Sequence, residues 1–331
     1  PPPPFILPRP PPPTTLEADR RQRQMCIRDR YSLANLLAPQ DSVTFYATGS
    51  LLALVLLGLG LVAAVFHLGK PSYFLTRAWR GITQWRTSWL SRELIALPAF
   101  MLLVAFYGAA HYLDFTQPWL VVKGQLPIDA TLVLGTLGVM GAIVLFVCTA
   151  MIYASLRFLQ EWHSPLTVAN FILFGLASGF TLAAAFSAWR GVELVAFYGV
   201  WAVIFTVLAA ITRGFSMYRT ARIKHKSTLQ TAIGVRHTKI RQKSMGFMGG
   251  SFNPREFFHG AGAGTVALVK IFFAVTVFLV PVVLLGASNA MQSAYLPMLA
   301  FVVQFFGLMV ERWYFCAEAR HPQNLYYQSM A

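Results

Sequence analysis

A histidine and a glutamate flank a short basic segment of the chain, residues 66–95, with the sequence FHLGKPSYFLTRAWRGITQWRTSWLSRELI. Between His67 and Glu93 stand five lysines or arginines and three tryptophans. An imidazole titrates at a pKa of about 6.5, and burial raises the pKa of a carboxyl group toward the same range. Side chains of these two types can therefore accept or donate protons near neutral pH.

This segment lies between two long apolar runs, and the rest of the chain repeats that pattern. Hydrophobic residues make up 56% of the 331 and charged residues only 12%, which is about half of what a soluble domain carries. About 20 apolar residues suffice for a helix to cross the hydrocarbon core of a bilayer. Seven such runs predict an all-α integral membrane protein built as a helical bundle, at residues 45–67, 93–113, 130–156, 166–189, 192–212, 265–286 and 292–315.

No run shows the alternation of a transmembrane β-strand, and no strand is expected. Pro281 falls inside the sixth run. We expect it to kink the helix without ending it, because a neighbouring helix can satisfy the carbonyl that proline leaves without a donor.

The first thirty residues differ from the rest of the chain. They are rich in proline and show no apolar periodicity, which predicts a tail that is disordered or artefactual. We therefore divide the chain into this tail, residues 1–30, and a single transmembrane helical domain, residues 31–331, with a long basic loop at 213–263.

Lysine and arginine are divided unequally between the two sides of the predicted bundle. The side that holds the loops 68–92 and 213–263 and the C-terminus carries eighteen of them, and we call it the basic side. The other side, beyond the N-terminal tail, carries Lys123 and Arg190. The positive-inside rule predicts that the basic loops and the C-terminus are cytoplasmic. The excess of 27 basic over 12 acidic residues then needs no nucleic acid partner, and it suits contact with anionic membrane lipid.

Other ionisable side chains stand where apolar runs meet the basic side. Tyr153, Arg157, Glu311 and Arg312 lie at such boundaries, and Lys270 lies about 8 Å inside the sixth run. Charges within or beside the membrane are candidates for functional sites, although each can also be a long side chain that reaches back to the water. Their shared side favours a functional site there.

A quinol is a substrate that fits such a site. Its oxidation releases two protons together with two electrons, and His67 and Glu93 offer groups that can take up protons. Trp79, Trp85 and Trp89 could wall a quinone ring, or they could serve only as interface anchors, a common role of tryptophan. Both roles remain open.

The longest loop contains the stretch RHTKIRQKSMGFMGGSFNPREFFHG, in which methionine and phenylalanine are mixed with cations. Exposing so many apolar side chains to water is unfavourable. A docking surface for another subunit is therefore favoured over a solvated linker.

Five stretches of the sequence occur together, and in this order, in a known family. They are HLGKP, TQWRTSWLSRE, MIYASLRFLQEW, GGSFNPREFFH and ERWYFCAEARHPQNLYY. On these stretches the chain, over residues 45–331, resembles the membrane anchor subunit of the dimethyl sulfoxide reductase family of molybdoenzymes. That family includes the anchors of related sulfite-oxidising complexes. Its anchors have eight helices, which implies that the first one is missing from the seven predicted here.

The resemblance implies a non-catalytic subunit of an oxidoreductase complex in the bacterial inner membrane, acting in anaerobic or respiratory electron transport. Such a subunit binds menaquinol or ubiquinol and holds no haem or iron–sulfur cluster. It exchanges electrons with a four-cluster iron–sulfur subunit, which serves a molybdopterin catalytic subunit. The family's quinol-linked histidine and carboxylate fall on His67 and Glu93. We extend the expected binding site to neighbouring loop residues and to the intramembrane lysine, namely Arg86, Trp89, Ser91, Arg92 and Lys270.

The direction of electron flow stays open. The anchor could take electrons from quinol for substrate reduction, or it could reduce quinone with electrons from a cytoplasmic sulfite dehydrogenase. A purely structural anchor and a transporter are further alternatives. A transporter would show discontinuous helices and polar residues in the middle of the membrane, whereas the runs here are continuous and their charges lie near the ends.

A haem held by two histidines is not expected, because His67 and His111 fall at opposite ends of the first two runs. His111, Asp114 and Asp129, on the other side, are interpreted as solvated helix ends and a short loop rather than as a proton path. The three cysteines show no CxxC spacing that would indicate a metal site.

Overall fold

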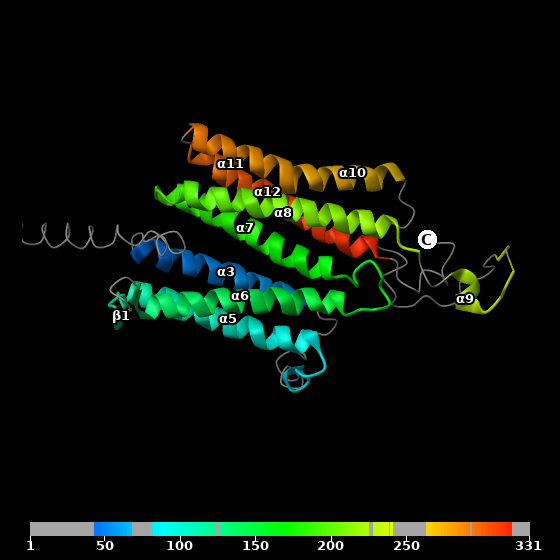
Figure 1. Ribbon diagram of the computed structural model, residues 1–331, viewed down its shortest axis with the longest axis horizontal. Helices are drawn as coiled ribbons and strands as arrows, with labels where there is room; N and C mark the ends of the chain where they lie inside the picture. Colours follow the sequence, from blue (N-terminus) through cyan, green and yellow to red (C-terminus); the bar gives the residue numbers. More distant parts are fainter. Residues whose placement is uncertain are drawn as a thin grey trace, which may run out of the picture.

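The computed structural model describes residues 43–67, 81–122, 126–224, 228–237, 239–240, 263–291 and 293–319. The expected tail at 1–30, most of the expected docking surface at 236–260 and the expected additional first helix fall outside these ranges. The described residues form a bundle of long helices (Figure 1). In chain order the elements are α3 (Val43–His67), α5 (Trp89–Tyr112), β1 (Leu120–Val122), β2 (Leu126–Ile128), α6 (Ala130–Ala154), α7 (Pro165–Arg190), α8 (Val195–Ala221), α9 (Leu229–Ile233), α10 (Ala263–Ala274), η2 (Val275–Leu279), α11 (Val280–Met291) and α12 (Tyr295–Glu318).

Seven helical segments among the described residues are long and apolar enough to cross a membrane. They correspond to the seven predicted runs, so the prediction of an all-α integral membrane protein is confirmed. Some boundaries differ: α5 begins before Glu93, at Trp89, and α8 continues past Thr212 to Ala221. Polar and charged residues extend these apolar helices because a cap or a partner on another helix satisfies them, as shown below.

Small residues allow the helices to approach one another closely. In Figure 1, α3, α5 and α6 form one side of the bundle, and α8 and α10–α12 form the other, with α7 packed against α6, α8 and α12. A methyl group on Gly175 of α7 would press against the Phe146 ring of α6, so glycine allows these two helices to approach closely there. An apolar cluster between α7, α8, α11 and α12 is made mostly of alanine: Ala184, Ala202, Leu285 and Ala300.

The sixth span contains a π-helical turn, η2, between α10 and α11. Pro281 follows that turn, and it has no N–H to donate to the carbonyl of Val277, four residues earlier. The side-chain Nε2 of Gln304 on α12 donates to this carbonyl at 3.2 Å. The helix continues through Pro281 to Met291, so the expectation that a neighbouring helix satisfies the freed carbonyl is confirmed.

A two-stranded antiparallel ribbon connects α5 to α6, with β1 paired to β2. The expectation of no strand is wrong at this point. The ribbon lies outside the seven spans, in a connection between helix ends where the backbone groups of a short loop can pair with each other.

Candidate functional site

Seven described helix ends lie at the basic side: α3, α6, α8 and α12 end there, and α5, α7 and α10 begin there (Figure 1). Two groups of polar side chains at these ends concern the site. The Glu93 group consists of Glu93, Thr149 and Tyr153. The Glu311 group consists of Arg213, Glu311, Arg312, Tyr314 and Glu318.

Glu93 lies near the N-terminus of α5, which Ser88 caps by accepting a hydrogen bond from the backbone N–H of Ser91 at 3.4 Å. The Oε1 atom of Glu93 accepts a hydrogen bond from Thr149 Oγ1 on α6 at 2.5 Å. The Glu93 side chain is partly buried, and its Oε2 has no hydrogen-bond partner within the described part of the chain. Glu93 is thus held by one oxygen, and the part of the chain that the structure describes offers its other oxygen no partner.

Arg92 shapes the turn that leads into α5. Its Nε and Nη2 donate to the carbonyls of Trp85 and Arg86 at 2.9 and 3.0 Å, and its guanidinium carbon lies 4.0 Å from the centre of the Trp89 ring. Ser91 is buried beside this turn, and Arg86 is exposed. Of the expected binding residues, Trp89, Ser91 and Arg92 therefore maintain the shape of the turn next to Glu93.

His67 is the last residue of α3, which packs against α5, and it lies at the same end of the bundle as Glu93. The side chain of His67 and the whole of Trp79 fall outside the residues that the structure describes. The expected pairing of His67 with Glu93 stays a prediction.

Tyr153 lies in an aromatic cluster near the end of α6. Its ring stacks on Phe171 of α7 with 5.5 Å between ring centres, and it meets the edges of Trp162 and Phe315 at 5.2 and 5.4 Å. These contacts place Tyr153 where α6, α7 and α12 meet.

Thr149 and Tyr153 are one helical turn apart, so they share a face of α6. Glu93, which Thr149 holds, is an electrostatic neighbour of Tyr153. The sequence identified Tyr153 only as a boundary residue, and Thr149 was missed. Their spacing of four at the end of a predicted helix is the signal that could have joined them to one site.

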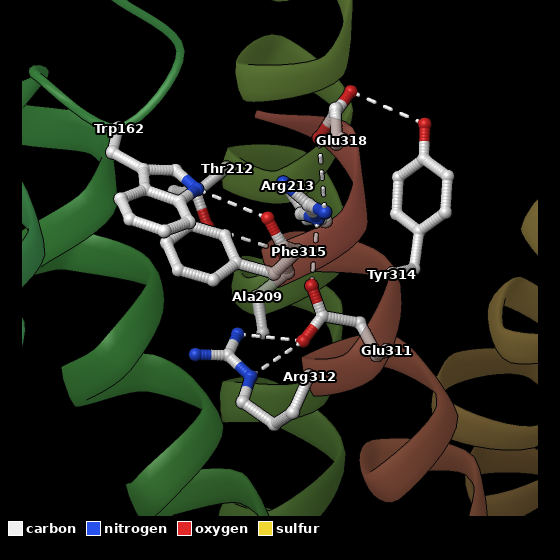
Figure 2. A network of polar contacts seen from close by, with 9 residues as sticks. All are labelled: Trp162, Ala209, Thr212, Arg213, Glu311, Arg312, Tyr314, Phe315 and Glu318. Atoms are coloured by element: carbon white, nitrogen blue, oxygen red, sulfur yellow. Dashed lines mark hydrogen bonds and ion pairs between the residues drawn. The ribbon is translucent and has the colours of Figure 1, made fainter. Parts of the chain in front are cut away.

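The Glu311 group lies between α8 and α12 (Figure 2). Arg213 Nε is 2.8 Å from Glu311 Oε1, and Arg312 Nε donates to Glu311 Oε2 at 2.7 Å. The Arg213 N–H is not directed at that oxygen, so the contact is an ion pair without hydrogen-bond geometry. Arg213 Nη2 also lies 3.4 Å from Glu318 Oε2, and Tyr314 donates to Glu318 Oε1 at 3.2 Å.

This arrangement changes the interpretation of two cations. Arg213 belongs to α8 and is 2% exposed, so its assignment to the basic loop 213–263 is wrong: the carboxylate of Glu311 holds it inside the bundle. Lys270 has its Nζ 5.6 Å from the centre of the Tyr314 ring. The structure therefore places Lys270, an expected binding residue, with the Glu311 group.

Aromatic rings separate the two groups. Phe171 and Phe315 contact Tyr153, and the guanidinium carbon of Arg312 lies 4.4 and 5.2 Å from the centres of the same two rings. Trp162 Nε1 donates to the carbonyl of Phe315 at 3.0 Å and fixes this cluster to α12. The Glu93 and Glu311 groups are therefore close neighbours with an apolar layer between them.

The other end of the bundle holds a buried histidine. The ring of His111 stacks on Tyr46 at 4.8 Å and meets the edge of Tyr107 at 4.7 Å. Asp129 caps α6, and Asp114 is exposed. The interpretation as a solvated helix end is correct for Asp114 and wrong for His111, because aromatic side chains from α3 and α5 cover the imidazole.

Comparison with known proteins identifies the family of the chain. The family model described as DMSO reductase anchor subunit (DmsC) matches residues 38–327. The C subunit of sulfite dehydrogenase from Allochromatium vinosum is 56% identical over 301 residues, which are 91% of this chain and 91% of that protein. No solved structure matches the chain. The match extends over nearly the whole length and confirms the resemblance seen in the five sequence stretches: the chain belongs to the family of DMSO reductase anchor subunits.

Proposed function

We propose that this chain anchors a sulfite-oxidising complex in the membrane and reduces a quinone on the basic side, with electrons received from an iron–sulfur partner subunit. The Glu93 group is the observation that carries the proposal. It offers a carboxyl group at the membrane boundary, oriented by Thr149 through one oxygen, with no partner for the other oxygen among the described residues.

The residues of this group suit quinone chemistry. A quinone takes up two electrons and two protons when it is reduced, and its oxygens need polar groups at the edge of an apolar environment. Glu93 supplies a carboxyl group that can transfer a proton at that place. His67, at the end of α3, is the expected second proton-transferring group, and Thr149 limits the orientations of the Glu93 side chain.

The similarity to the A. vinosum protein favours one direction of electron flow. The protein from A. vinosum is named as a subunit of sulfite dehydrogenase, and oxidation of sulfite by water to sulfate releases two protons and two electrons. A molybdopterin catalytic subunit would pass the electrons to a four-cluster iron–sulfur subunit, and that subunit to the membrane. Menaquinone and ubiquinone are both suitable acceptors.

The proposed orientation places the basic side in the cytoplasm, where the partner subunits would dock. Arg213 and Arg219 lie on α8 and no longer count among the loop cations, and these two changes leave the charge imbalance nearly intact. The stretch 236–260, rich in methionine and phenylalanine, is the proposed contact with the iron–sulfur subunit.

Replacement of Glu93 by glutamine tests the proposal. Glutamine keeps the size and can still accept from Thr149, but it cannot transfer a proton. In membranes that contain the complex, we expect sulfite-dependent reduction of added quinone to fall at least about tenfold, with unchanged amounts of assembled subunits. Glu193→Gln, the same change at an exposed position near the start of α8 on the other side, is the matched control and should leave the rate unchanged.

Two results would contradict the proposal. A Glu93→Gln complex that assembles and reduces quinone at the wild-type rate would leave the chain a purely structural anchor. A wild-type complex that oxidises quinol to reduce a terminal acceptor, and has no sulfite-dependent activity, would show that electrons flow in the opposite direction.

A further inference from the structure

Tyr153 carries a hydroxyl for which its packing gives no reason. Its ring contacts with Trp162, Phe171 and Phe315 would be the same for phenylalanine. A tyrosine hydroxyl in a largely apolar cluster usually finds a hydrogen-bond partner. No residue that the structure describes forms a hydrogen bond with the Tyr153 hydroxyl.

The position of this hydroxyl points to Glu93. Thr149 donates to Glu93 Oε1, and Tyr153 follows about one turn later on the same face of α6, about 6 Å further toward the basic side. Glu93 is among the charged or polar neighbours of Tyr153, together with Cys316 and Arg312. A hydroxyl of α6 and a carboxylate oxygen of α5, neither with a partner among the described residues, thus belong to adjoining helix ends at the basic side.

We propose that the Tyr153 hydroxyl and the Glu93 carboxyl group together bind the headgroup of the quinone. This inference rests on the proposed function and adds a residue that lies outside the segment 66–95 and on a different helix. Quinone oxygens accept hydrogen bonds, and quinol oxygens also donate them. A tyrosine hydroxyl and a carboxyl group can each donate or accept, so the same pair can hold both redox states.

The neighbouring Glu311 group offers a ligand no such opening. Both oxygens of Glu311 contact arginine, and Tyr314 already donates to Glu318. A headgroup that entered there would have to separate buried ion pairs, which is strongly unfavourable. A headgroup that bound to the Tyr153 hydroxyl and to Glu93 Oε2 would break no hydrogen bond or ion pair between described side chains.

Tyr153→Phe tests the inference, because it removes the hydroxyl and keeps the ring. For the complex purified in detergent, we expect the Kd of a short-chain naphthoquinone and of a short-chain benzoquinone, measured by calorimetry, to rise about three- to tenfold, the effect of one hydrogen bond. Tyr107→Phe, the same change in the aromatic cluster at the other end of the bundle, is the control and should leave the Kd unchanged. Thermal unfolding of each variant separates lost binding from lost structure.

The outcomes distinguish the inference from the proposed function. An unchanged Kd in Tyr153→Phe, with weaker binding in Glu93→Gln, would overturn the role of Tyr153 and leave the proposed function in place. Unchanged Kd values in both variants would show that the quinone does not bind at this end of the bundle. Equal losses in Tyr153→Phe and Tyr107→Phe would also overturn the inference, because the effect would then not be local.

Discussion

Glu93 and Glu311 lie at the same end of one bundle and are held in opposite ways. Glu311 is fully buried, and Arg213 and Arg312 face its two oxygens. Glu93 is partly buried, accepts one hydrogen bond from the neutral Thr149, and keeps an oxygen without a described partner. The pair with Arg213 makes the first carboxylate a link between α12 and α8, whereas the second has one described hydrogen bond, from a neutral hydroxyl.

The difference teaches how to interpret charges at a membrane boundary. Both glutamates stand at the ends of apolar runs on the basic side, and by position alone each was a candidate for function. The two glutamates are distinguished by the partners of their side chains. A charge saturated by opposite charges stabilises the bundle, and a charge that is oriented but not saturated can act on a ligand.

The largest effect on stability is expected from Glu311→Gln. This change leaves Arg213 inside the bundle without its nearest counter-charge, for which a loss of about 3–5 kcal/mol in the free energy of unfolding is typical. The purified complex should unfold at a clearly lower temperature, and less of the chain should accumulate in the membrane. Protein that remains folded should bind quinone normally.

Glu193→Gln serves again as the control for this change of charge. A Glu311→Gln chain as stable as the wild type would show that Glu318, 3.4 Å from Arg213, is a sufficient partner. Glu311 would then not be needed for the stability of the bundle, and this part of the contrast between the two glutamates would be wrong.

A smaller effect, in activity and not in stability, is expected from Thr149→Val. The change removes a hydroxyl at nearly constant shape, and a hydrogen bond of this kind contributes about 1 kcal/mol. Quinone reduction should fall several-fold because Glu93 loses its fixed orientation, with little change in the temperature of unfolding. Thr149→Ser restores the hydroxyl and should restore the rate; equal rates in the valine and serine variants would show that Thr149 does not position Glu93.

The sequence predicted the helices well because each is a long apolar run, and length and hydropathy are local properties. It predicted the ends of the helices less well. Arg213 extends α8 because Glu311 pairs with it from α12, and no local pattern reveals a pairing between distant runs. The connection at β1 and β2 was missed for a related reason, since a short ribbon depends on pairing between its two strands.

The candidate site was predicted in part. Glu93 was recognised from its place after the stretch TSWLSR at the start of a run, and the structure shows its orientation by Thr149, which the sequence could not give. Lys270 was grouped with Glu93 by its depth in the membrane alone, and depth does not tell which helices are neighbours. The role of His67 stays a prediction.

Locating the bound quinone tests the central claim most directly. A photoreactive, azido-substituted quinone would be cross-linked to the complex by illumination, and the labelled peptides would be identified by mass spectrometry, with excess unmodified quinone as competitor. We expect competed labels at the start of α5 and the end of α6, beside Glu93 and Tyr153. Competed labels confined to the Glu311 group, or to the buried His111 at the other end, would contradict the account.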